Sequence, residues 1–212
     1  MDPSFWNQKW EKHEIAFHES KANPLLVKHF TELSVAKGSR IFVPLCGKTR
    51  DISWLLSNGS RVAGAELSHI AIEQLFMELG LQPEISTVGD VEQWSANRLD
   101  IFVGDIFAVS RKMLGPVDAV YDRAALVAFP EAMRNRYTTH LTEMTHKAPQ
   151  LLICYDYDQS VMQGPPFSVR NEEVHRQYAD NYELTLIAST DVPGGLKGKC
   201  AAKENVWRLT SK

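Results

Sequence analysis

The stretch Arg40-Ile41-Phe42-Val43-Pro44-Leu45-Cys46-Gly47-Lys48-Thr49-Arg50 decides the fold. Its first part is apolar and rich in residues that favour strands, which predicts a buried strand over 40–45. The part that contains Gly47 predicts a turn, and residues 51–56 have the pattern of a helix. A buried strand followed by a turn and a helix is the unit from which helix-covered parallel sheets are built.

The same alternation continues to the end of the chain. We expect further strands at 61–67, 99–107, 117–121, 151–155, 184–189 and 205–209, and helices at 70–79, 134–144 and 171–178. Near-continuous apolar strands separated by helices indicate an α/β fold with a parallel sheet covered on both faces. The last two strands are joined by Pro193-Gly194-Gly195 with no helical pattern between them, so we expect an antiparallel hairpin.

Length and charge restrict the function. The 212 residues favour one domain, 1–212, and no linker or repeat divides them. Lys and Arg number 23 against 26 Asp and Glu, for a net charge of −3, which is no footprint for nucleic acid or an anionic membrane. We therefore expect a small-molecule partner, no nucleic acid and no membrane. We also expect a monomer.

The cysteines and the N-terminus predict the compartment. Cys46, Cys154 and Cys200 are far apart and form no C-x-x-C pair, so neither a disulfide framework nor a metal site is indicated. The chain has no secretory apolar segment near its start and no run of ~20 apolar residues. A reduced, cytoplasmic protein without a metal is the expectation.

The turn after the first strand lacks the two common phosphate-binding motifs. Gly47-Lys48-Thr49 ends like a P-loop, but Phe42 stands where that motif needs its first glycine. The G-x-G-x-x-G dinucleotide motif is also missing. These absences argue against a nucleoside triphosphate and against a nicotinamide dinucleotide.

Two carboxylates follow expected strands. Glu66 lies 21 positions after Leu45, near the spacing at which a carboxylate accepts both hydroxyls of a ribose. A solvated strand-end carboxylate is the alternative. Asp105 is a second candidate for the cofactor site, where it would face an adenine edge, and its alternative is to cap the next helix.

A nucleoside cofactor without a pyrophosphate points to S-adenosylmethionine, whose cationic sulfonium favours an aromatic face. Such a face is offered near the N-terminus by Trp6, Trp10, His13 and Phe17, which recur at helical spacing. Core packing is the alternative for this stripe. Because two tryptophans are costly to leave in water, we expect the helix to close over a ligand.

Several strings together resemble the thiopurine S-methyltransferase family, from about Phe5 to Leu209. The P-L-C-G-K and D-R-x-A-L strings are the most specific of them. The strings are Trp6-x-x-x-Trp10, Phe42-Val43-Pro44-Leu45-Cys46-Gly47-Lys48-Thr49 with Asp51, Trp54-Leu55, Gly64-x-Glu66-Leu67-Ser68, Tyr121-Asp122-Arg123-Ala124-Ala125-Leu126 and Gly164-Pro165-Pro166-Phe167.

The resemblance implies a Rossmann-like class I methyltransferase fold with a seven-stranded, mostly parallel sheet and an antiparallel last strand. It implies S-adenosylmethionine as methyl donor and the thiol of an aromatic heterocycle as acceptor. On the matching positions, Trp10 would contact the cofactor, Leu45 would contact it through its backbone, Glu66 would hold the ribose hydroxyls, and Arg123 would border cofactor and acceptor. Ala124 departs from the family's animal members, which have glycine there, and this puts acceptor preference in doubt.

With such a core over 40–212, only residues 1–39, as a helical lid, and the loop near Gly164 remain to build an acceptor pocket. We expect Arg123 to act as the catalytic residue by stabilising the acceptor thiolate, and an ion pair with Asp122 or another acid is its alternative. Phe167 would cover the acceptor ring or belong to a stiff surface loop. Cys46 is expected to be buried and not a nucleophile, because direct transfer needs no covalent intermediate.

Other functions stay open from the sequence. One alternative is a detoxifying methyltransferase whose acceptor is a selenium or tellurium compound instead of a thiopurine. The sequence does not separate the two, because any soft nucleophile satisfies the same geometry. A non-catalytic nucleotide-binding protein of the same fold is the alternative from another class. The intact strings around Glu66 and Arg123 argue against it.

Overall fold

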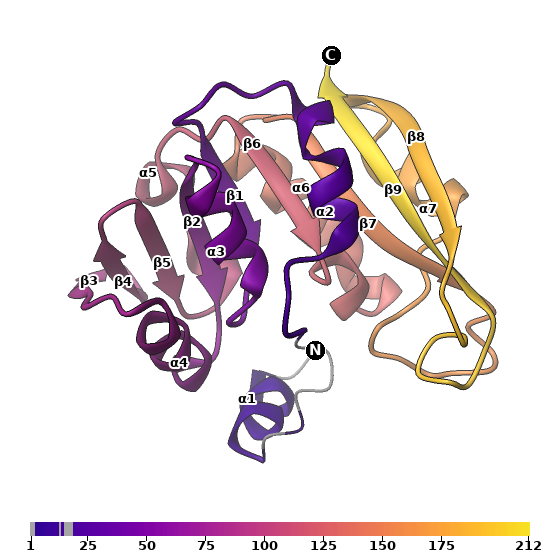
Figure 1. The fold of residues 1–212 in the computed structure, drawn as a ribbon. Helices are drawn as coiled ribbons and strands as arrows, with labels where there is room; N and C mark the ends of the chain where they lie inside the picture. The colour runs from indigo at the N-terminus through magenta and orange to yellow at the C-terminus, as the bar shows by residue number, and fades with distance from the viewer. Residues whose placement is uncertain (1–2, 13, 15–18) are drawn as a thin grey trace. The chain divides into compact units, whose positions relative to one another are not determined.

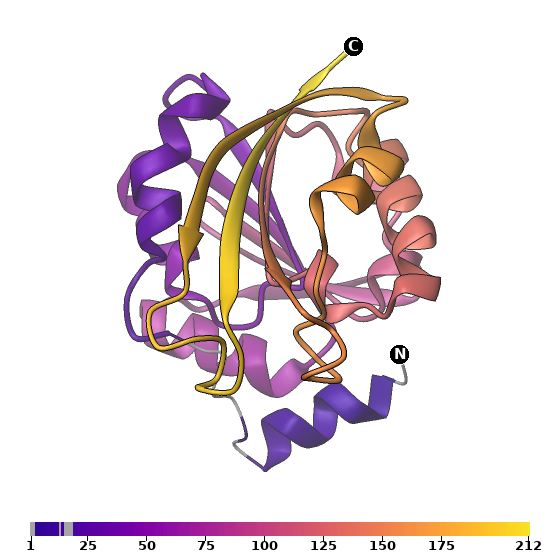
Figure 2. The same cartoon turned by 90° about the vertical axis from the view of Figure 1, so that its right-hand side faces the viewer.

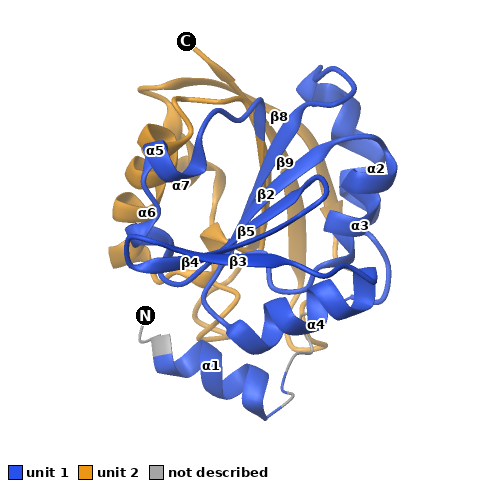
Figure 3. Ribbon diagram, turned by 90° about the vertical axis from the view of Figure 1, so that its left-hand side faces the viewer, with its two compact units in different colours: residues 1–119 blue, residues 120–212 orange. Residues whose placement is uncertain are grey.

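The computed structural model describes residues 3–12, 14 and 19–212. The chain forms two compact units, residues 1–119 and 120–212, which Figure 3 colours separately. The division expected from the sequence, a lid over 1–39 and a core over 40–212 within one domain, stays a prediction.

The first unit is built on a parallel sheet (Figure 1). β1, β2 and β5 run parallel, β4 is antiparallel to β5, and β3 is antiparallel to β4. The elements of this unit are α1 (Pro3–Glu11), α2 (Pro24–His29), η1 (Phe30–Leu33), β1 (Arg40–Pro44), α3 (Arg50–Ser57), β2 (Arg61–Glu66), α4 (His69–Leu79), β3 (Glu84–Val88), β4 (Val91–Ala96), β5 (Leu99–Val103), η2 (Ile106–Ala108) and α5 (Arg111–Leu114).

Local sequence sets the ends of the two helices that follow β1 and β2. Thr49 caps α3 by accepting the amide of Asp51, and Ser68 caps α4 by accepting the amide of Ala71. α4 ends at Gly80, whose φ of +66° suits glycine. The predicted strand, turn and helix over 40–56 are confirmed, as is the helix at 70–79.

The hairpin of β3 and β4 was not predicted. Its turn is Gly89-Asp90, with Gly89 at φ +60°. A Gly-Asp dipeptide between two short strand-like segments is the sequence signal that could have predicted this hairpin. Within β4 only Val91 and Trp94 are buried, and Trp94 packs against Phe76 of α4 with ring centroids 5.9 Å apart. β3 is mostly exposed, including Ile85 at 54%, so no buried face gives its sequence an apolar periodicity.

The strand expected over 99–107 ends earlier, at Val103. Gly104 has φ +147°, and a Cβ there would lie 2.7 Å from the side chain of Val91. The chain therefore turns away at the glycine, and Ile106–Ala108 form the short helix η2 instead of more strand.

The second unit contains the C-terminal strands and two helices. β6 and β7 are parallel, and β9 is antiparallel to both β7 and β8. Figure 2 shows β8 and β9 as the long hairpin that was predicted from Pro193-Gly194-Gly195. The elements of this unit are β6 (Ala119–Arg123), whose first residue belongs to the first unit, η3 (Leu126–Ala128), α6 (Glu131–Met144), β7 (Gln150–Tyr157), α7 (Asn171–Tyr178), β8 (Tyr182–Asp191) and β9 (Ala202–Ser211).

All seven expected strands are present, with shifted ends, and β3 and β4 add to them. The strand order is β3-β4-β5-β2-β1 in the first unit and β6-β7-β9-β8 in the second. The expected parallel sheet with an antiparallel last strand is confirmed. Over the described part of the chain, no helix is long and apolar enough to cross a membrane.

Candidate functional site

The end of β1 turns sharply at a residue that is not glycine. Leu45 has φ +46°, a left-handed conformation that costs a side-chain-bearing residue about 1–3 kcal/mol. The turn is held because Cys46 donates its amide to the carbonyl of Ala65 on β2, at 3.0 Å. Strain of this kind at a strand end is typical of a binding site.

The carboxylate of Glu66, the last residue of β2, accepts hydrogen bonds from this turn. Gly47 donates its amide to Oε2 at 2.7 Å, and Ser68 donates its amide to Oε1 at 2.9 Å. The side chain is buried, with 7% of the residue exposed. A carboxylate has about four lone-pair sites, so Glu66 keeps acceptor capacity beyond these two hydrogen bonds.

Burial dominates the electrostatics of Glu66. Loss of water raises the pKa of its carboxyl above the ordinary value of 4.5, and the amides of Ser68, Gly47 and Leu67 oppose this rise. Burial also raises the pKa of Cys46 well above its ordinary value, with a second contribution from the charge of Glu66. Cys46 is buried, as expected, and its thiol is not poised to act as a nucleophile.

Trp10 of α1 covers the same turn. It is 3% exposed, and a Cβ built on Gly47 would lie 3.0 Å from Cζ2 of its indole. Trp6 lies on the same helix and packs edge-on against Phe5, with centroids 5.2 Å apart. The other two members of the aromatic stripe, His13 and Phe17, lie outside the described residues.

Asp105 follows β5 and Gly104. The amide of Gly104 donates to the carbonyl of Glu66 at 2.8 Å, which brings the two strand ends together. The Asp105 side chain is exposed and accepts the amide of Phe107 at 3.0 Å, so it caps η2. The structure therefore bears out the capping alternative, and a role toward an adenine stays a prediction.

The basic residues of the turn are engaged in ion pairs. Lys48 and Arg50 contact the two carboxylate oxygens of Glu78 on α4, at 2.8 and 3.0 Å. This tie holds the turn against the helix that follows β2. It gives Lys48 a structural partner in the position where a P-loop lysine would contact phosphate.

In the second unit, Arg123 is the last residue of β6 and is half-buried. The next residue, Ala124, has φ +69°, which explains why glycine suits this position. Sequence reasoning named Asp122 only as an ion-pair partner for Arg123. The structure shows it fully buried, with Oδ1 accepting the amide of Leu126 at 3.1 Å and Oδ2 accepting the hydroxyl of Tyr137 at 2.7 Å.

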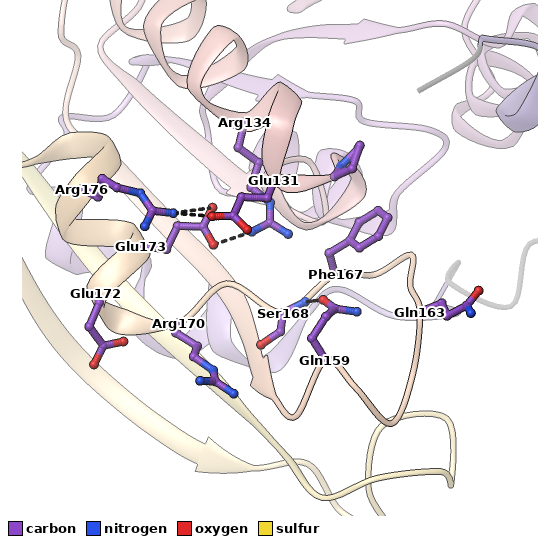
Figure 4. A pocket seen from close by; sticks show the side chains of 11 residues that line it. Glu131, Arg134, Gln159, Gln163, Phe167, Ser168, Arg170, Glu172, Glu173 and Arg176 are labelled. Carbon is purple, nitrogen blue, oxygen red and sulfur yellow. Dashed lines mark hydrogen bonds and ion pairs between the residues drawn. The ribbon is translucent and has the colours of Figure 1, made fainter.

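A cavity lies wholly within the second unit, beside the loop that carries Phe167 (Figure 4). Its volume is about 520 Å³, and acidic and basic side chains in equal number line it. Its lining residues are Pro130, Glu131, Arg134, Gln159, Gln163, Phe167, Ser168, Arg170, Glu172, Glu173 and Arg176.

Phe167 is fixed at this cavity from two directions. Its amide donates to the carbonyl of Val127 at 2.7 Å, and its ring lies 5.8 Å from the guanidinium of Arg134. Arg134 is itself paired with the buried Glu173 at 2.5 Å, as the dashed lines of Figure 4 show. A Cβ on Gly164 would lie 2.6 Å from Cδ1 of Phe167, so the loop needs a glycine at that position.

No group of three or more His, Cys, Asp or Glu among the described residues is arranged to hold a metal ion. The chemistry that the described sites offer is hydrogen-bond acceptance by a buried carboxylate, aromatic cover from Trp10 and a permanent positive charge on Arg123.

Comparison with protein families gives one match over the whole chain. The family model for thiopurine S-methyltransferase matches residues 1–212. The thiopurine S-methyltransferase of Xanthobacter autotrophicus is 59% identical and that of Teredinibacter turnerae 50% identical, each over 99% of this chain and 98–99% of the relative. The thiopurine S-methyltransferase of Acinetobacter baylyi is 44% identical over the full length of both chains.

Solved structures share the fold. The 1,6-didemethyltoxoflavin-N1-methyltransferase of Burkholderia thailandensis, with bound S-adenosylhomocysteine, matches with a TM-score of 0.66 and 14% identity, over 99% of this chain and 87% of that one. The magnesium protoporphyrin IX methyltransferase of Synechocystis PCC 6803 matches with a TM-score of 0.63 and 11% identity, over 99% and 100% of the chains. These similarities confirm the class I methyltransferase fold.

Proposed function

The chain belongs to the thiopurine S-methyltransferase family, and from this we propose that it transfers the methyl group of S-adenosylmethionine to the sulfur of thiopurines and other aromatic or heterocyclic thiols. The observation that carries the proposal is the buried carboxylate of Glu66. It lies at the carboxyl end of β2, where ligands bind in sheets of this kind, and retains lone pairs for a vicinal diol.

Four residues of the first unit are the proposed cofactor ligands. The two ribose hydroxyls donate to Glu66, the strained backbone of Leu45 contacts the cofactor, and the indole of Trp10 covers it from α1. Asp105 is the candidate for the adenine edge, since capping η2 uses only part of its acceptor capacity. The donor set fits an adenosine without a pyrophosphate, because the turn offers a carboxylate and an aromatic ring instead of a glycine-rich cradle.

S-adenosylmethionine supplies an activated methyl group that is transferred in line to the acceptor sulfur. The chain's own contribution is positioning, since an in-line displacement depends on the alignment of its reactants. Arg123 carries a permanent charge and stabilises the acceptor as a thiolate, whose proton is released to solvent, so little help from a general base is needed. Arg123 is also proposed to border the cofactor, as the family resemblance implies.

For the acceptor, we propose that the loop from Gly164 to Phe167 and the N-terminal segment over 1–39 set specificity. The restraint of Phe167 by Arg134 and by the carbonyl of Val127 supports a fixed aromatic wall. Such a wall suits a planar heterocycle, which gains contact area by stacking.

Two measurements test the function. Calorimetric titration is expected to give binding of S-adenosylmethionine and S-adenosylhomocysteine and none of NADH. Mass spectrometry is expected to show one methyl group added to 6-mercaptopurine, with a lower kcat/KM for Arg123→Ala. Tight binding of NADH without binding of either sulfur compound contradicts the proposal, and an unchanged kcat/KM and pH profile for Arg123→Ala contradicts the role of Arg123.

We also propose that the enzyme acts as a monomer in the cytoplasm. Its three cysteines are free thiols, which suits a reducing compartment. Light scattering is expected to give a mass near the 23.9 kDa of one chain, and a mass of two chains contradicts the monomer.

A further inference from the structure

Asp122 ties three parts of the second unit together. It lies in β6, its Oδ1 accepts the amide of Leu126 in the following turn, and its Oδ2 accepts the hydroxyl of Tyr137 on α6. The side chain is fully buried, so these hydrogen bonds stand in for the water that the carboxylate has lost. Asp122 therefore links the strand end, the turn and the helix through one charged group.

The turn that Asp122 closes contains a residue with a strained backbone. Ala124 has φ +69°, and a side-chain-bearing residue keeps such a conformation only where its surroundings hold it. Arg123 stands between Asp122 and Ala124 in the chain. The carboxylate thus fixes the backbone on both sides of Arg123, through its own position in the strand and through the amide of Leu126.

We propose that Asp122 is a positioning residue for methyl transfer, because it holds the turn 123–126, and with it the direction of the Arg123 side chain, against α6 through Tyr137. The inference rests on the proposed function, in which Arg123 stabilises the acceptor thiolate. An arginine side chain that extends from a fixed backbone loses less conformational entropy when it binds the acceptor. Small errors in the position of its guanidinium greatly weaken its stabilisation of the thiolate.

The surroundings of Asp122 make its hold on the turn depend on pH. Burial raises its pKa from 3.8 to about 6, and the hydrogen bonds from Tyr137, Leu126 and Ala125 oppose the rise. The titratable groups that face it are Tyr137 from α6, Cys154 from β7 and Tyr178 from α7. The charges of Arg134 on α6, Glu173 on α7 and Asp156 on β7 act on Cys154.

The hydrogen bond between Asp122 and the turn differs in strength between the two protonation states of the carboxyl. An ionised carboxylate makes charge-assisted hydrogen bonds that are about twice as strong as neutral ones. A protonated Asp122 accepts the Leu126 amide more weakly. Arg123 is therefore held best above pH 6 and less well below it.

The first test compares Asp122→Asn with the native enzyme in kcat/KM for S-adenosylmethionine and 6-mercaptopurine between about pH 5 and 8.5. Asparagine has the same shape and keeps an oxygen for the Leu126 amide, so the variant is expected to fold. The ratio of variant to native kcat/KM cancels the ionisation of the acceptor itself. We expect a ratio of about one tenth at pH 8 that rises toward one below pH 6, where the native Asp122 is also neutral.

Tyr137→Phe tests the same group from α6. Removal of the phenol takes away a hydrogen bond that favours the carboxylate, so the acid limb of kcat/KM is expected to shift to higher pH. Tyr182→Phe is the matched control, because Tyr182 is equally buried and its phenol accepts a hydrogen bond from Gln150 at 3.0 Å. The control is expected to keep the native pH profile.

A third variant separates this inference from the proposed function. If Asp122 acts through Arg123, then Asp122→Asn has no further effect on kcat/KM in an Arg123→Ala background. If Arg123→Ala lowers kcat/KM but Asp122→Asn costs the same factor in both backgrounds, the positioning role is wrong and the proposed function stands. A ratio for Asp122→Asn that stays flat with pH also overturns the positioning role. Native kcat/KM for Arg123→Ala alone overturns the role of Arg123, and the positioning role with it.

Discussion

The indole of Trp10 lies so close to Gly47 that a Cβ on this glycine would be 3.0 Å from Cζ2 of the ring. The same glycine donates its amide to Glu66 at 2.7 Å. One residue without a side chain thus lets the N-terminal helix and the carboxylate at the end of β2 meet at a single turn.

Gly47→Ala is expected to weaken binding of S-adenosylmethionine by about tenfold or more, because the added methyl displaces Trp10. Calorimetric titration measures the loss. Gly80→Ala is the control, since Gly80 has a similar φ of +66° but nothing within 4 Å of the added carbon. The two variants share the backbone strain, so equal affinities would show that the contact with Trp10 does not matter.

Glu66→Gln is expected to lower the affinity for S-adenosylmethionine by about 10- to 100-fold. The amide nitrogen of glutamine would face a backbone N–H that now donates to a carboxylate oxygen, and it accepts no ribose hydroxyl. Glu84→Gln, on the exposed face of β3, is the control and is expected to bind like the native protein.

The affinity of the native protein is also expected to fall as the pH drops through the raised pKa of Glu66, because the protonated acid loses acceptor capacity. Glu66→Gln has no such titration. Parallel pH dependence of affinity in both proteins would contradict the ribose-binding role.

Asp122→Asn is expected to stabilise the protein at high pH. The folded-state pKa of Asp122, about 6, lies above the ordinary 3.8, so the folded state binds this proton more tightly than the unfolded chain. The resulting stability is complete below pH 4 and is lost as pH rises through 6, by about 3 kcal/mol at most. The variant should match the native Tm near pH 4 and exceed it at pH 8, and an equal Tm at both pH values would contradict the buried charge.

Ala124→Gly is expected to raise the free energy of unfolding by up to about 1 kcal/mol, or a few degrees in Tm, because glycine adopts a φ of +69° without strain. Ala125→Gly is the control. Ala125 has φ −81° and is buried, so glycine there only adds freedom to the unfolded chain and removes a packed methyl group. Destabilisation by both substitutions would show that the turn is not strained at Ala124.

Glu173→Ala is expected to cost about 3–5 kcal/mol, because it leaves the buried guanidinium of Arg134 without its partner. It should also loosen Phe167, which packs on Arg134. Arg176→Ala breaks an exposed pair with Glu131 and a longer contact with Glu173 at 3.9 Å, and is expected to cost less than about 1 kcal/mol. Chemical denaturation measures both, and a similar cost for the two would contradict the importance of burial.

Most of the fold could be predicted from periodicity. The strands at 40–45 and 151–155 are buried on both faces and are nearly continuous in apolar residues, so their pattern is strong. β3 could not be found in this way, because its side chains are mostly exposed. The strand expected over 99–107 is too long, since the apolar pattern continues past Gly104 whereas β5 ends at Val103, before Gly104 with its φ of +147°.

The sequence by itself determined the family, the methyl donor and the position of Glu66 at a strand end. These follow from short motifs such as P-L-C-G-K and from the spacing of strands, both of which can be read from residues that are close together in the chain. Only the tertiary structure decided that Gly47 links Trp10 to Glu66, and that Asp122, which accepts the amide of Leu126, also ties β6 to Tyr137 on α6. These relations join elements that are distant in the chain. Burial then sets the electrostatics, since the pKa of Asp122 is raised by the packing around it and not by its neighbours in sequence.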